Sequence, residues 1–152
     1  MYYFEVGKEV KGSGAPMLWW TDDLTSGIDF IDNQHKELFN RVNEVFSAVN
    51  VNDEAMIRST FEYLITYVIE HFGAEESYMI LYLYDDFAEH RESHNYFVLQ
   101  VNELHRRFST EEITEEERKE LVDALQLLLV EWLVNHIHDF DKKLAASIRK
   151  EE

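Results

Sequence analysis

The sequence of 152 residues contains no cysteine, and this absence removes several kinds of chemistry at once. Disulfide bonds, thiolate metal ligands and thiol nucleophiles all require that residue. Any metal ligand in this chain therefore has to come from histidine, carboxylate or other side chains.

Residues that disfavour helices are also scarce. Pro16 is the only proline, and four of the five glycines precede residue 30. Beyond Gly27, Gly73 is the one residue whose type strongly opposes a helix. Apolar residues make up 45% of the chain, which is enough for a hydrophobic core. The length suits one domain, so we predict a single all-α fold.

Positive charge is in short supply. Fourteen Lys and Arg face 31 Asp and Glu, which gives a formal net charge of −17. Nucleic acids and anionic membrane surfaces bind clustered Lys and Arg, so neither is expected as a partner. The apolar stretch Leu127–Val134 is interrupted by Glu131 and is too short to span a bilayer. No secretory signal is visible in MYYFEVGKEV, so we expect a cytoplasmic protein without membrane insertion.

An irregular arm, residues 1–26, is followed by a region, residues 27–150, that is dominated by helical periodicity. Apolar residues recur there at spacings of three and four. Asn52-Asp53, Asp85-Asp86 and a capping box of Thr114 with Glu117 separate the helices. Short connections favour an up-down-up-down antiparallel four-helix bundle. The four predicted helices cover residues 29–49, 54–83, 87–108 and 114–148.

Five of the seven histidines fall on the apolar stripes of these helices. Burying polar rings in a bundle centre is costly unless something binds them. Counted from the turns at about 1.5 Å per residue, they lie at a common depth to within roughly one turn, and His136 fits least well. We therefore expect one polar layer in the bundle. Its members are His35 on the first helix, His71 with Glu75 on the second, His90 and His94 on the third, and His136 on the fourth.

The residue types indicate a metal site. Imidazoles with carboxylates and no thiol suit iron, manganese, zinc or copper. Seven ligands are too many for one tetrahedral ion, and they suit two ions bridged by carboxylates. The acid of the fourth helix stays open at this point. Asp139 shares the face of His136 in a regular helix, whereas Asp141, five residues after His136, does not.

The ordered series of ligand motifs resembles the hemerythrins, specifically the bacterial hemerythrin domains, from about Trp20 to Lys143. The motifs are His35, His71-Phe-Gly-Ala-Glu75, His90-Arg-Glu-Ser-His94 and His136-Ile-His-Asp-Phe-Asp141. The resemblance implies two iron ions with an oxo or hydroxo bridge. His90, His94 and His136 would hold one iron and His35 and His71 the other, with Glu75 and Asp141 bridging. The family places its acid five residues after the histidine, which favours Asp141.

The resemblance also implies a function, which is reversible O2 binding at the open position of the iron held by His35 and His71. Such a protein would be a non-enzymatic oxygen carrier, store or local sensor. An apolar lining would exclude water and proton donors. The alternatives are a di-iron enzyme that consumes peroxide or nitric oxide or oxidises ferrous iron, and a metal-free bundle. The expected lining consists of Leu38, Phe72, Trp132, Leu133 and Ile137, while His105 and His138 are expected to lie outside the site.

Overall fold

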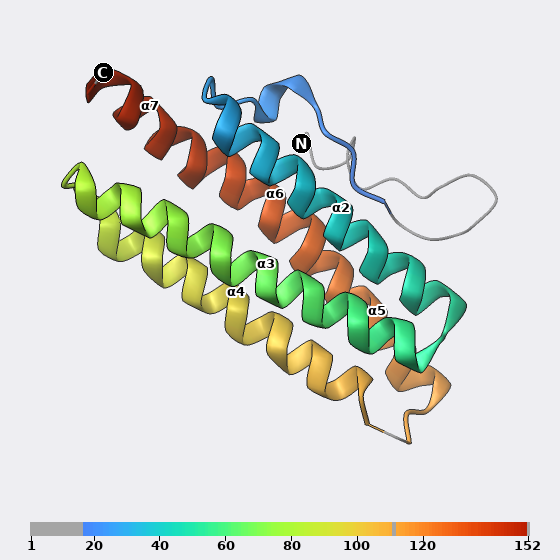
Figure 1. The fold of residues 1–152 in the computed structure, drawn as a ribbon. Coiled ribbons are helices and arrows are strands. Elements are labelled where there is room, and N and C mark those ends of the chain that lie inside the picture. Colours follow the sequence, from blue (N-terminus) through green and yellow to red (C-terminus); the bar gives the residue numbers. More distant parts are fainter. Residues whose placement is uncertain (1–16, 111, 152) are drawn as a thin grey trace.

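The structure, a computed structural model, describes residues 17–110 and 112–151 as four antiparallel rods (Figure 1). The predicted all-α, up-down-up-down four-helix bundle is confirmed. The first three rods are α2 (Asp29–Val51), α3 (Glu54–Leu81) and α4 (Phe87–Phe108). The fourth rod runs without a break through α5 (Glu115–Gln126), η2 (Leu127–Trp132), α6 (Leu133–His136), η3 (Ile137–Asp141) and α7 (Lys142–Glu151).

Two of the three predicted helix starts have the expected caps. The Asp53 side chain accepts a hydrogen bond from the Met56 backbone N–H at 3.1 Å. Thr114 and Glu117 form the reciprocal capping box. The third expectation is wrong, because Asp86 precedes α4 without a side-chain cap bond. Its carboxylate instead contacts the Lys143 ammonium of α7.

The fourth rod departs from the regular helix that the periodicity predicted. The backbone N–H of Leu133 bonds to the carbonyl of Leu128, and that of Lys142 bonds to Ile137, each five residues back. These are π-helical turns, which hold one residue more than an α-turn. Each wide turn therefore changes which side chains share a face further along the rod.

The core is divided into two apolar clusters that lie on either side of the predicted polar layer. On α2, Ile31 belongs to the smaller cluster and Leu38 to the larger one, with His35 between them. The same order holds on α3, where Glu75 lies between Phe72 and Met79. Four rods thus bring their polar positions to one level. Tyr78, Tyr82 and Tyr84 pack against the smaller cluster.

The described end of the N-terminal arm is packed onto the bundle. The Leu18 backbone N–H donates to Asn43 Oδ1 at 2.8 Å, and Asn43 Nδ2 donates back to the Leu18 carbonyl at 3.0 Å. A short 3-10 turn, η1 (Asp22–Leu24), buries Leu24 completely. Residues 1–16 of the predicted arm lie outside the described residues. Of the helices in the described part of the chain, none is long and apolar enough to cross a membrane.

Candidate metal centre

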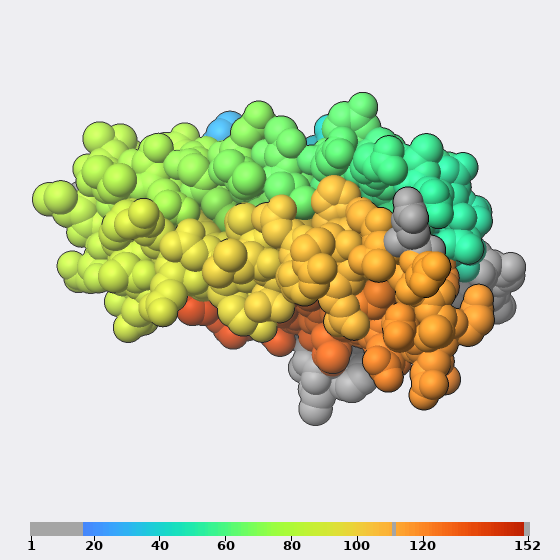
Figure 2. All heavy atoms as spheres, turned by 90° about the horizontal axis from the view of Figure 1, so that it is seen from below, coloured from blue at the N-terminus to red at the C-terminus, as the bar shows by residue number. Residues whose placement is uncertain are grey.

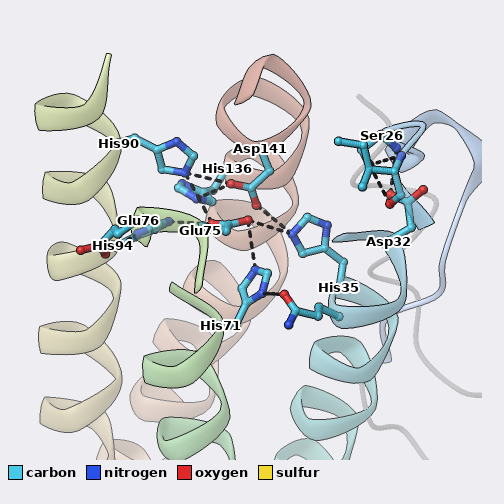
Figure 3. A network of polar contacts seen from close by, with 12 residues as sticks. Ser26, Asp32, His35, His71, Glu75, Glu76, His90, His94, His136 and Asp141 are labelled. Atoms are coloured by element: carbon cyan, nitrogen blue, oxygen red, sulfur yellow. Dashed lines mark hydrogen bonds and ion pairs between the residues drawn. The ribbon is translucent and has the colours of Figure 1, made fainter. Parts of the chain in front are cut away.

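Each rod contributes side chains to a single buried layer (Figure 3). The structure brings all seven predicted site residues together, and none exposes more than 3% of its surface. Histidine rings and carboxylates converge from four helices onto one space in the bundle. The layer consists of His35 from α2, His71 and Glu75 from α3, His90 and His94 from α4, His136 from α6 and Asp141 from η3.

The carboxylate of Glu75 lies between two groups of histidines. We call His90, His94 and His136 the three-histidine group, and His35 and His71 the two-histidine group. Glu75 Oε1 is 3.0 Å from His94 Nε2 and 3.6 Å from His90 Nε2. Glu75 Oε2 is 3.2 Å from His71 Nε2 and 3.5 Å from His35 Nε2. One oxygen therefore faces each group.

Asp141 repeats this arrangement from the opposite rod. Its Oδ1 is 2.9 Å from His90 Nε2 and 3.1 Å from His136 Nε2. Its Oδ2 is 3.0 Å from His35 Nε2. Both carboxylates thus span the same two groups of imidazole nitrogens.

The layer contains buried polar atoms that the protein itself does not satisfy. Within residues 17–110 and 112–151, Nε2 of His35, His71, His94 and His136 and both oxygens of Glu75 have no hydrogen-bond partner. Such atoms cost free energy when they are buried without partners. The ligand atoms of each histidine group and the two carboxylates lie within 4.8 Å of one another. The donor set therefore fits two metal ions that share the carboxylates.

The charges of the layer are balanced by protons when no cation is present. Burial lowers the pKa of His35 and of His90, but the carboxylates of Asp141 and Glu75 outweigh this effect and raise both pKa values to about 9. Burial raises the pKa of Glu75, but the charge of His71 and the close ring nitrogens of His35, His71 and His90 hold it well below its usual value. Cations bound here would take the place of those protons.

The π-turn η3 decides which acid joins the layer. Asp141 follows His136 by five residues, and the wide turn between them returns the chain to the same face. Asp139 instead exposes 64% of its side chain, and its Oδ1 lies 2.9 Å from His138 Nδ1. The spacing of a regular helix favoured Asp139, and that interpretation is wrong because the helix is not regular here.

Three hydrogen bonds behind the rings were not foreseen from the sequence. Their partners are chain neighbours of predicted site residues, and this adjacency is the one signal that the sequence offered. Such bonds orient a ring and leave its other nitrogen free to bind a metal. His71 Nδ1 is 2.7 Å from Gln34 Oε1, His94 Nδ1 is 2.8 Å from Glu76 Oε2, and His136 Nδ1 is 2.8 Å from Ser93 Oγ.

Aromatic rings surround the layer. Phe72 stacks on His94 with a centroid distance of 3.8 Å and an angle of 6° between the planes, and it also contacts His71. Trp132 stacks on His136 at 4.9 Å. Trp20 of the arm lies 6.4 Å from His35, a contact that the sequence did not predict. The other expected lining residues, Leu38, Leu133 and Ile137, are buried in the same cluster as Phe72.

The two remaining histidines lie away from the layer. His105 stacks on Phe61 with a centroid distance of 5.1 Å, and His138 contacts Asp139 on the surface. Among the described residues, neither belongs to a group that could hold a metal ion.

Comparison with known proteins gives consistent matches. The sequence pattern of the Hemerythrin HHE cation binding domain matches residues 26–148. A bacteriohemerythrin of Pseudomonas aeruginosa is 34% identical over 132 residues, which cover 87% of this chain and 82% of that protein. A bacteriohemerythrin of Methylococcus capsulatus is 31% identical over 128 residues, 84% of this chain and 93% of that protein. A crystal structure of wild-type hemerythrin superposes with a TM-score of 0.68 at 29% identity, covering 87% of this chain and 97% of the other.

Proposed function

Because the chain belongs to the hemerythrin family, we propose that its buried layer holds two iron ions with an oxo or hydroxo bridge and binds O2 reversibly. The three-histidine group would hold one ion and the two-histidine group the other. Glu75 and Asp141 would bridge them. The proposal rests on one observation. In both Glu75 and Asp141, one carboxylate oxygen lies near the three-histidine group and the other lies near the two-histidine group.

The two ions would have unequal numbers of protein ligands. The three-histidine group with both carboxylates offers five ligands, and the two-histidine group with the same carboxylates offers four. The side of His35 and His71 therefore leaves more room for an external ligand. A ferrous pair held by these residues would supply the electrons for reversible O2 binding.

The side chains around the open position beside His35 and His71 would exclude water from it. Leu38, Phe72, Leu133 and Ile137 are each at most 3% exposed, and Trp132 closes the wall beside His136. None of these side chains carries a titratable group. A bound ligand would therefore meet no proton donor from the wall, which favours the return of O2.

This wall is also the reason to place an enzymatic role second. An enzyme that consumes peroxide or nitric oxide, or that oxidises ferrous iron, gains from a proton donor or a polar entry at the reacting position. The five lining residues provide neither. Reversible binding without turnover is the function that this arrangement supports best.

The experiment is anaerobic loading with ferrous iron, followed by cycles of O2 addition and removal under visible spectroscopy. We expect an absorption band that appears with O2 and disappears when O2 is removed, over several cycles. A spectrum that changes once and does not return would contradict reversible binding. Continued consumption of peroxide by the loaded protein would favour the enzymatic alternative.

A further inference from the structure

The hydrogen bonds behind the site histidines differ in charge. His71 faces the neutral amide of Gln34, and His136 faces the hydroxyl of Ser93. The Nδ1 atoms of His35 and His90 are buried and have no hydrogen-bond partner among the residues that the structure describes. Among these five rings, His94 alone donates its Nδ1 hydrogen to a carboxylate, that of Glu76. The three-histidine group thus has an anion bonded behind it, and in the described part of the chain the two-histidine group has none.

Both carboxylate oxygens of Glu76, which lies on α3, contact side chains of α4. Its Oε2 lies 2.8 Å from His94 Nδ1, and its Oε1 lies 3.7 Å from Nε of Arg91, also on α4. The side chain is 23% exposed and lines an open groove of about 550 Å³ between α3 and α4. These two helices lie side by side, green and yellow, on the face that Figure 2 shows. Glu76 is therefore anchored without being sealed in the core.

Two contacts together determine where His94 points. The parallel ring of Phe72, 3.8 Å away, fixes the plane of the imidazole but leaves it free to turn within that plane. The bond from Nδ1 to Glu76 removes this freedom. His94 Nε2 is then directed at Glu75 Oε1, 3.0 Å away. Figure 3 shows His94 between Glu76 on its outer side and Glu75 on its inner side.

We propose that Glu76 is a positioning residue that aims His94 and makes the three-histidine ion the more easily oxidised of the two. This inference rests on the proposed iron pair. A carboxylate that accepts the ring N–H strengthens the other nitrogen as a metal donor, and a charged acceptor does this more strongly than a neutral one. The added electron density favours the ferric state of the ion that His94 binds. Gln34 gives His71 the same orientation without the charge.

The experiment separates orientation from charge with two substitutions at one position. Glu76→Gln keeps an oxygen acceptor of the same length and removes the charge, whereas Glu76→Ala removes both. Glu92→Gln is the matched control, because Glu92 is an exposed acid on α4 two residues before His94. Circular dichroism verifies that each variant is folded. The measurements, made without O2, are the affinity for Fe2+, the affinity for Zn2+ and the reduction potential of the loaded protein.

We expect Glu76→Ala to weaken the metal affinity of one of the two ions by roughly 10–100-fold, the usual effect of removing such a partner. Glu76→Gln should retain most of the affinity and raise the reduction potential. Glu92→Gln should leave both quantities at the parental values. The proposal would be overturned if the reduction potential of Glu76→Gln equalled that of Glu92→Gln. It would also be overturned if Glu76→Ala bound Fe2+ and Zn2+ with the parental affinity.

The design also separates this inference from the function it rests on. A protein that holds two irons but does not bind O2 would refute the proposed function, while the potentials would still decide the role of Glu76. A parental protein that binds neither Fe2+ nor Zn2+ would overturn both.

Discussion

Single atoms determine what the polar layer can hold. The two oxygens of Asp141 face different groups of histidines, with Oδ1 near His90 and His136 and Oδ2 near His35. Asp139, two residues earlier, is exposed and contacts His138. Neighbouring acids of the same kind thus have opposite surroundings, which allows a matched test.

Replacing Asp141 by alanine should remove a ligand from both proposed ions. We expect iron content to fall from about two per chain to one or less after anaerobic loading and gel filtration. Asp139→Ala should leave it unchanged, because its carboxylate is outside the layer. Elemental analysis of the two variants decides the point, and equal losses in both would contradict this placement of the acid.

A polar group in the lining should shorten the time for which O2 stays bound. Leu133 is completely buried, and Leu133→Asn would bring an amide into the apolar wall. The cost in stability should be about 1–3 kcal/mol, which a stability of roughly 5–15 kcal/mol tolerates. We expect both irons to remain and the O2-dependent spectrum to decay faster in stopped-flow mixing. An unchanged lifetime with full iron content would mean that Leu133 does not control release.

At the scale of helices, the fourth rod shows how local geometry serves the layer. A regular helix would turn Asp141 away from His136, and the π-turn η3 turns it back. A second π-turn, η2, precedes His136 in the same rod. The periodicity of apolar residues predicted that a helix exists here, but it did not show which turns of that helix hold an extra residue.

Gly73 offers a test of helix energetics on α3. Apart from its chain neighbours and the nearby backbone of α3, a Cβ added there would meet no atom of the described residues within 4 Å, so packing does not require glycine. Gly73→Ala should therefore stabilise the protein by about 0.5–1 kcal/mol, the usual helix-interior difference. Denaturant unfolding measures this. Gly27→Ala is the opposite control, because Gly27 has φ +89° and its added Cβ would approach Arg149, and it should destabilise. A loss of stability in Gly73→Ala would contradict the account of this helix.

At the scale of the whole molecule, the polar layer separates two apolar clusters and concentrates charge between them. Much of this was predictable from the sequence. The five histidines lie on apolar stripes at matching depths, which predicts both the bundle and the layer. The partners Gln34, Glu76 and Ser93 were not predictable, because each bonds to a ring on another helix, and the sequence does not specify how the helices are rotated against one another.

Metal binding should release protons from the layer. Burial lowers the pKa values of His35 and His90, but the carboxylates of Asp141 and Glu75 outweigh burial and raise both values to about 9. Both rings therefore carry protons at neutral pH in the metal-free protein. A metal ion needs the neutral ring, so affinity should rise with pH up to about 9 and then level off.

Titration calorimetry with Zn2+ in buffers of different ionisation enthalpy measures the protons released. We expect more than one proton per chain at pH 7. Bound metal should also raise the melting temperature, since it binds only the folded layer. Binding with no proton release and no pH dependence would contradict the charge balance described for this layer.

The central claim is that two irons lie in this layer, each beside its own group of histidines. Anomalous diffraction at the iron edge, from crystals of protein loaded with ferrous iron, tests it most directly. The account predicts two peaks per chain, one contacted by His90, His94 and His136 and the other by His35 and His71, with Glu75 and Asp141 contacting both. A single peak, or two peaks that share no carboxylate, would contradict it.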